Sequence, residues 1–176
     1  MIRTFTAAVL LASIFAAPSF AALKPGDAAP DFTVPATLGG NEFIFSLADA
    51  LKKGPVVLYF FPKAFTKGCT AEANAFAEAT AQFTAAGATL VGMSADDIGT
   101  LQKFSTQECS SKFPVAADPS LKVIKAFDAV MENRNISDRV SYVIGQDGKV
   151  VYAYADRNPD KHVENTLTAV KALPKK

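Results

Sequence analysis

Histidine and cysteine are scarce in this chain of 176 residues, which holds one histidine and two cysteines. Two cysteines cannot staple a disulfide-dense scaffold, and a single histidine does not favour a cluster of metal ligands. Positive charge is not concentrated either, because 18 Lys and Arg face 17 Asp and Glu and no basic run exceeds two residues. A nucleic-acid partner, which needs a basic surface, is therefore not expected.

Glycine patterns that cradle phosphates are also missing, since Gly39-Gly40 fits a turn and not a phosphate-binding loop. What is present is an ordinary globular composition, with 49% hydrophobic and 20% charged residues. This composition argues against disorder, collagen and coiled coil. The length suits one domain that buries a sizeable core without the help of disulfide bonds or a bound metal.

The first 21 residues have the pattern of a secretory signal peptide. Arg3 gives a positive start, residues 6–17 form a small-apolar run, and Ser19-Phe20-Ala21 places small residues where a signal peptidase cleaves. The alternative is a membrane anchor, but the run is shorter than the roughly 20 residues that a spanning helix needs. We expect residues 1–21 to be removed, leaving a domain of residues 22–176 that is exported to the periplasm without a membrane attachment.

The rest of the sequence alternates between strand-like and helix-like segments. Residues 56–60 form a continuous apolar run, which is typical of a central strand covered on both faces. We predict further strands at 31–34, 42–45, 88–93, 113–116, 140–144 and 149–154, the last two joined as a hairpin by an Asp-Gly turn. We predict helices at 47–52, 70–86, 97–108, 120–127 and after Asn158-Pro159. This order predicts an α/β domain with helices on both faces of a mixed sheet.

The segment between the central strand and the next helix carries the candidate chemistry. Cys69 is expected at the mouth of that helix, where unpaired backbone N–H groups and the helix dipole favour an anion. Lys67 adds a cation two residues away, and such surroundings lower a thiol pKa and favour the reactive thiolate. The pattern therefore indicates a nucleophilic cysteine, with a buried structural cysteine as the alternative.

These residues resemble the peroxiredoxins. Pro62, Thr66 and Cys69 match the P-x-x-x-T-x-x-C motif, and residues 68–72, Gly-Cys-Thr-Ala-Glu, resemble the G-C-T-x-E run of the bacterioferritin-comigratory (Q-type) branch. That branch belongs to the alkyl hydroperoxide reductase/thiol-specific antioxidant superfamily. The likeness extends over nearly all of the chain after the signal peptide, through residues 26–32, 94–96, 112–118, 139–144 and 147–150.

The resemblance implies a thioredoxin-like fold and a thiol-dependent peroxidase that reduces hydrogen peroxide or organic hydroperoxides. Cys69 would attack the peroxide and become a sulfenic acid, while Thr66 would hold the peroxide by a hydrogen bond. Arg139 would stabilise thiolate and peroxide, and Pro62 would shield the pocket from water. A strand-start arginine with a solvated head is the alternative for Arg139.

The resemblance implies no metal or organic cofactor, and a thioredoxin-like protein or a small thiol would serve as reductant. We expect a monomer or a weak dimer. The sole histidine, His162, falls in the first turn of the last predicted helix, and we expect it on the surface.

Two positions depart from the Q-type pattern. Lys67 and Asn74 stand where members often have a proline and a second cysteine. Cys109 is expected to be half-buried at the edge of the apolar face of the helix over 97–108. We expect it to be the resolving cysteine, because some relatives place one in this helix. The alternative is that Cys69 works alone with an external thiol.

Two other functions remain open from the sequence. An exported thioredoxin-like thiol–disulfide oxidoreductase would share the fold and compartment, but it needs a cysteine where Thr66 stands. A non-catalytic binding domain would have a Cys69 thiol of ordinary pKa, near 8.5.

Overall fold

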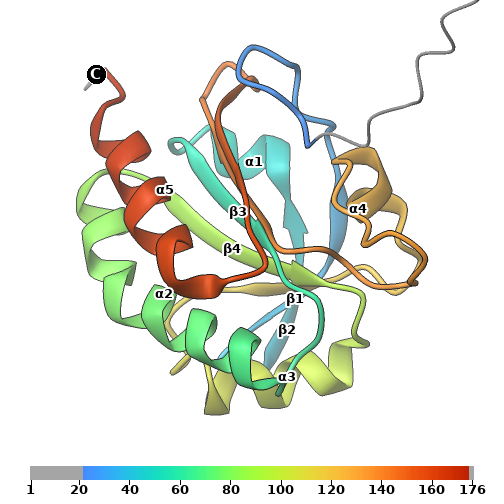
Figure 1. Ribbon diagram of the computed structural model, residues 1–176. Helices are drawn as coiled ribbons and strands as arrows, with labels where there is room; N and C mark the ends of the chain where they lie inside the picture. The colour runs from blue at the N-terminus through green and yellow to red at the C-terminus, as the bar shows by residue number, and fades with distance from the viewer. Residues whose placement is uncertain (1–21, 175–176) are drawn as a thin grey trace, which may run out of the picture.

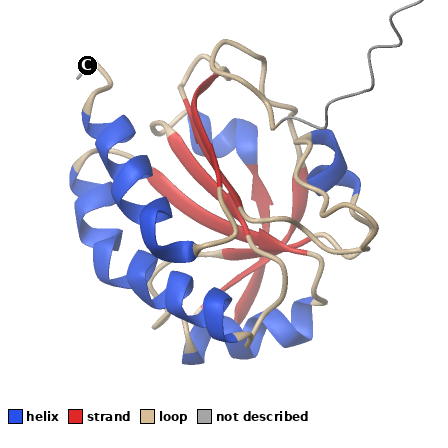
Figure 2. Cartoon of the chain, in the orientation of Figure 1, coloured by secondary structure: helices blue, strands red, loops and turns tan. Residues whose placement is uncertain are grey.

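The computed structural model describes residues 22–174 as a seven-stranded mixed sheet with helices on both faces (Figure 2). The strand order is β2-β1-β5-β4-β3-β6-β7. The strands are β1 (Thr33–Leu38), β2 (Asn41–Ser46), β3 (Val56–Phe60), β4 (Thr89–Ser94), β5 (Val115–Ala117), β6 (Val140–Ile144) and β7 (Val150–Ala155). The helices are α1 (Leu47–Leu51), α2 (Lys67–Ala85), α3 (Ile98–Gln107), α4 (Lys122–Ala126) and α5 (His162–Lys171), with a 3-10 turn at Pro159–Lys161.

Strand β3 lies at the centre and every one of its residues is buried. It pairs in parallel with β4 and antiparallel with β6, so no edge of it is free. Its side chains alternate between two cores, with Val57 and Tyr59 in one and Leu58 and Phe60 in the other. A continuous apolar run is what a strand covered on both faces requires, and the prediction from that run is confirmed.

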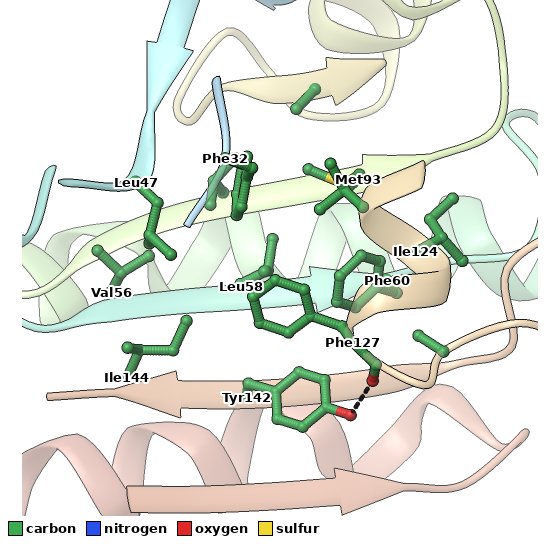
Figure 3. Packing of buried hydrophobic residues seen from close by; sticks show 14 of the residues in the cluster. Phe32, Leu47, Val56, Leu58, Phe60, Met93, Ile124, Phe127, Tyr142 and Ile144 are labelled. Carbon is green, nitrogen blue, oxygen red and sulfur yellow. Dashed lines mark hydrogen bonds between the residues drawn. The ribbon is translucent and has the colours of Figure 1, made fainter. Parts of the chain in front are cut away.

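The two cores have different helix covers. Helices α2, α3 and α5 pack on one face, while the short helices α1 and α4 cover the other (Figure 1). In the α1/α4 core the ring of Phe127 packs against Tyr142 with centroids 5.6 Å apart. The Tyr142 hydroxyl donates a 2.7 Å hydrogen bond to the Phe127 carbonyl, which satisfies a buried polar atom (Figure 3).

Several element boundaries differ from the prediction. Helix α2 begins at Lys67 and not at Thr70, because Thr66 has an extended backbone and its carbonyl already accepts from the N–H of Thr70. Helix α4 begins at Lys122, where the Asp118 carboxylate accepts from the backbone N–H groups of residues 122, 123 and 124. Strand β5 covers only Val115–Ala117, later than predicted. The hairpin of β6 and β7 is confirmed.

The predicted signal peptide, residues 1–21, lies outside the described residues. Within residues 22–174, no helix combines the length and the apolar character that crossing a membrane requires. Over the same range, no group of three or more His, Cys, Asp or Glu is placed to hold a metal ion.

Candidate active site

Cys69 is the third residue of α2 and is almost fully buried. The loop that carries the chain from β3 to this helix is anchored by Asp96, which follows β4. The Asp96 carboxylate accepts 2.8 Å from the backbone N–H of Ala64 and 2.9 Å from the Ser94 hydroxyl. Because β3 and β4 are parallel, their carboxyl ends meet at one edge of the sheet, and this bond fixes the loop before Cys69.

The loop ends with two residues that present polar and aromatic groups to solvent. Phe65 has a left-handed backbone (φ 63°), and its partly exposed ring packs edge-on against Phe104 of α3, 5.3 Å between centroids. Thr66 precedes α2, and its hydroxyl donates 3.0 Å to the carbonyl of Lys63 and does not cap the helix. The first backbone N–H groups of α2 therefore have no side-chain cap at the Cys69 end.

Arg139 provides the cation beside the sulfur. It lies at the start of β6 and is buried, so the alternative of a solvated head is wrong. Its Nη2 donates to Cys69 Sγ at 3.5 Å, its Nε donates to the carbonyl of Arg157 at 3.0 Å, and its Nη1 donates to Glu72. Three bonds on three nitrogens hold the guanidinium in one orientation.

Gly68 gives Arg139 the room to reach the sulfur. A Cβ atom at position 68 would lie 3.2 Å from Arg139 Nη2, which is tighter than ordinary van der Waals contact. The exposed side chain of Lys67, which the sequence suggested as the activating cation, is not the one that contacts the sulfur. Pro62 is half-buried and opens the same loop.

Glu72 closes the G-C-T-x-E run, but no role was predicted for it from the sequence. It follows Cys69 by three positions on α2, so both side chains lie on one helix face. Its side chain is fully buried and pairs with Arg139. Burial raises the pKa of Glu72 to about 8, and the guanidinium of Arg139 offsets that effect only in part. The i, i+3 spacing behind the cysteine was the signal that could have found it.

His162 is buried, so the prediction of a surface position was wrong. Burial of the imidazole is tolerated because both ring nitrogens have hydrogen-bond partners. Nδ1 lies 2.8 Å from the Ser141 hydroxyl, and Nε2 lies 2.9 Å from the carbonyl oxygen of Asp156. The ring packs edge-on against Tyr154, 4.8 Å between centroids. Burial lowers the pKa of His162, and the charge of Arg139 lowers it further.

Cys109 is a free thiol in the same core cluster as Cys69, and it is fully buried rather than half-buried as predicted. Cys109 lies two residues beyond the end of α3. Ser110 and Ser111 follow it with left-handed backbones (φ 49° and 55°). Burial and, to a lesser extent, the charge of Glu108 raise the pKa of the Cys109 thiol well above its usual range.

A thiol held beside a buried guanidinium at a helix start is what a cysteine peroxidase needs, and comparison with known proteins decides the family. The family model described as AhpC/TSA matches residues 25–153. The chain belongs to the AhpC/TSA family. As a peroxiredoxin of this family it is a thiol-dependent peroxidase that reduces hydroperoxides through a cysteine sulfenic acid.

Peroxiredoxins from other organisms are similar to this chain over most of its length. A Mycobacterium tuberculosis protein classed among the peroxiredoxins is 36% identical over 147 residues, 80% of this chain and 90% of the relative. The chloroplastic peroxiredoxin Q of Oryza sativa subsp. japonica is 33% identical over 153 residues, 86% of this chain and 68% of the relative. The Q-type resemblance inferred from the sequence is thereby confirmed.

A solved structure shows the same fold. The crystal structure of peroxidoxin BcpB from Mycobacterium tuberculosis superposes with a TM-score of 0.78 at 28% identity, covering 87% of this chain and 99% of that one. The predicted thioredoxin-like α/β fold of a peroxiredoxin is confirmed.

Proposed function

We propose that Cys69 is the peroxide-reacting residue of this peroxiredoxin. Its thiolate sulfur attacks the nearer oxygen of the hydroperoxide, the O–O bond breaks, and the sulfur keeps one oxygen as a sulfenic acid. The departing oxygen takes up a proton and leaves as water or an alcohol. The observation that carries this proposal is the 3.5 Å contact between Arg139 Nη2 and Cys69 Sγ, since a fixed cation stabilises the thiolate.

Three further groups assist the O–O cleavage. The Thr66 hydroxyl donates a hydrogen bond to the Lys63 carbonyl, so its oxygen lone pairs can accept a hydrogen bond from the O–H of the substrate. The uncapped N–H groups at the start of α2 and the guanidinium of Arg139 are suited to the charge that develops on the departing oxygen. Pro62, half-buried in the loop, limits the access of water to the thiolate.

Cys109 is proposed as the resolving cysteine. Its thiol condenses with the Cys69 sulfenic acid, forming one disulfide and releasing one water. The buried thiol of raised pKa is a poor nucleophile in the closed fold, so the chain near Ser110 must open before the sulfurs meet. The two left-handed serines there, an uncommon conformation for non-glycine residues, favour opening at this point.

The pattern of a signal peptide in the first 21 residues supports a proposal on the compartment. We propose that the signal peptide directs the chain to the periplasm, where a thioredoxin-like protein or a small thiol reduces the oxidised enzyme. Expression of the full chain and of a chain lacking residues 1–21, followed by fractionation, tests export. The proposal requires the full chain to appear in the periplasm without residues 1–21, and equal cytoplasmic retention of both chains would overturn it.

The peroxidase proposal is tested by rapid mixing of the reduced protein with hydrogen peroxide, using Cys69→Ser and its matched control Cys109→Ser. Cys69→Ser removes the attacking sulfur, so peroxide consumption should stop. Cys109→Ser leaves the first step intact, so one equivalent should be consumed at the wild-type rate. Single-equivalent consumption that survives in Cys69→Ser would overturn the assignment.

A further inference from the structure

A chain of buried charged and polar groups runs from Cys69 to helix α5. Arg139 bridges the sulfur to Oε2 of Glu72. The other oxygen of Glu72, Oε1, is buried without a hydrogen-bond partner and lies 3.7 Å from Nδ1 of His162. Both side chains of this second contact are fully buried. A buried carboxylate oxygen without a hydrogen bond lowers the stability of the fold, because it has lost its water and gained no partner. A proton bound between Glu72 and His162 would remove this cost.

The hydrogen bonds of His162 fix which ring nitrogen carries the proton. A backbone carbonyl only accepts, so Nε2 carries the proton that bonds to the Asp156 oxygen. In the neutral ring Nδ1 is then unprotonated and accepts from the Ser141 hydroxyl. Nδ1 and the unpartnered Oε1 of Glu72 are thus two acceptors that face each other, and one added proton between them turns the contact into a favourable one.

The surrounding groups do not supply that proton. Arg139 already serves Glu72 and Cys69. Tyr154 of β7 presents its ring to His162, and the Asp156 side chain is exposed and bonds to Tyr154 and the N–H of Asn158. On α5 and its approach, Lys161 and Glu164 pair with each other in solvent.

From β3, the hydroxyl of Tyr59 is buried near Glu72 and both cysteines, and its pKa is raised well above its ordinary value, first by burial and then by those charges. Tyr59 therefore stays neutral over the working range of pH. Glu72 and His162 are left as the groups near Cys69 that can exchange a proton.

The charge balance of this buried group depends on Cys69. With the thiolate and the Glu72 carboxylate both ionised, Arg139 is the one buried cation among them and the group carries one net negative charge. We propose that Glu72 and His162 form a proton-binding pair that is coupled to Cys69, taking up a proton when the thiol becomes a thiolate and releasing it when the sulfur becomes a neutral sulfenic acid. The proposal rests on the role of Cys69 as the peroxide-reacting thiol. Glu72 and His162 act through Arg139 and are positioning residues.

In this proposal the proton is bound by Glu72 Oε1 and faces His162 Nδ1, whose one lone pair it takes over from the Ser141 hydroxyl. Burial raises the pKa of Glu72 and lowers that of His162, and both directions favour this arrangement. A protonated Glu72 leaves the charge of Arg139 to the sulfur, so thiolate forms without a net buried charge. The protons of the oxidation step also balance. Thiolate, hydroperoxide and one proton give sulfenic acid and alcohol, and the pair gives up one proton at that step.

The sole histidine makes the pair directly observable. Nitrogen NMR of an untagged protein labelled at histidine reports His162 without ambiguity. The titration midpoint of its Nδ1 signal is compared between the reduced Cys109→Ser protein and the same protein with Cys69→Ala added. Because the thiolate attracts the proton, the midpoint with Cys69 present should be higher by about one pH unit, the size typical of strongly coupled sites. Equal midpoints would overturn the coupling, since a histidine with only a packing role does not sense the sulfur.

The reciprocal measurement follows the thiolate by its ultraviolet absorbance in the Cys109→Ser background, without peroxide. Glu72→Gln frees Arg139 for the sulfur, so thiolate should form at lower pH. His162→Gln removes the acceptor for the Glu72 proton, so thiolate should form at higher pH. Adding His162→Gln to Glu72→Gln should then change nothing.

Val163→Ala, on the same helix and half-buried, is the control for general loosening of α5, and it should leave the thiolate midpoint unchanged. Additive effects of the Glu72 and His162 substitutions would contradict the pair. Failure of the Cys69 assignment is recognised separately, because peroxide consumption would then survive in Cys69→Ser.

Discussion

Arg139 Nη2 lies 3.5 Å from Cys69 Sγ, although 70 positions separate the two residues in sequence. The contact joins the first turn of α2 to the start of β6, and the pairing of β6 with β3 sets the distance between them. The guanidinium is held on its other nitrogens by Glu72 and the carbonyl of Arg157. The cation is therefore fixed before substrate arrives and needs no rearrangement during attack.

Removal of this cation should act on the rate of peroxide attack more than on the fold. Arg139→Met is expected to lower the second-order rate constant by about a hundred- to a thousandfold, the usual cost of losing one fixed donor to developing charge. Arg157→Met is the matched control, because only its backbone carbonyl contacts Arg139 and its side chain is largely exposed. Stopped-flow peroxide reduction checks both. A loss below threefold in Arg139→Met would remove this residue from the mechanism.

The hydroxyl of Thr66 should contribute by a similar amount. Thr66→Val keeps the shape of the side chain but removes the acceptor for the substrate O–H, so the rate constant should again fall by roughly a hundredfold or more. Thr66→Ser keeps the hydroxyl and should retain most of the rate. The bond to the Lys63 carbonyl is exposed, so the urea midpoint of Thr66→Val should change little. Equal rates in the Val and Ser variants would contradict the role.

The sequence predicted the scaffold of the site because its signals are local. The apolar run of β3, the turn of the final hairpin and the motif around Cys69 each depend on neighbouring residues. Fold class and order of elements were therefore correct. Boundaries were less exact, because they depend on which side chain accepts from the N–H groups of the first turn, as the Asp118 carboxylate does at the start of α4.

The environment of His162 could not be predicted in the same way. Its burial depends on Ser141 of β6, Asp156 after β7 and Glu72 of α2, which are brought together only by the fold. The position alone, in the first turn of an amphipathic helix, suggested solvent. The burial of Cys109 likewise depends on where the chain turns after α3.

The raised pKa of Glu72 has a consequence for stability. A carboxyl with a folded-state pKa of about 8, against the ordinary value of 4.5 in the solvent-exposed unfolded chain, binds more protons in the folded than in the unfolded chain between those pH values. Stability should therefore fall as pH rises from 5 toward 8, with a limiting slope of about 1.4 kcal/mol per pH unit for one proton. Urea unfolding of Cys69→Ser, compared with Cys69→Ser/Glu72→Gln, measures this. The Gln variant should lack that decline, and parallel pH profiles would contradict the buried, proton-binding Glu72.

The role of Cys109 is tested by the product of one oxidation cycle. After one equivalent of peroxide, non-reducing mass spectrometry should find a Cys69–Cys109 linked peptide within a monomer. Because a disulfide requires α-carbons within about 7 Å and Cys109 is buried, the link should form more slowly than peroxide is consumed. A persistent sulfenic acid at Cys69 with Cys109 free would mean a one-cysteine enzyme with an external thiol.

The chemical state of Cys69 after a single turnover shows whether its sulfur is the group that reacts with peroxide. Reduced Cys109→Ser is mixed with one equivalent of hydrogen peroxide, trapped with a sulfenic-acid-specific dione and digested for mass spectrometry. We expect the adduct on the peptide containing Cys69, in an amount equal to the peroxide consumed, and none in Cys69→Ser treated in the same way. Peroxide consumption by Cys109→Ser that leaves Cys69 as an unmodified thiol would contradict this expectation.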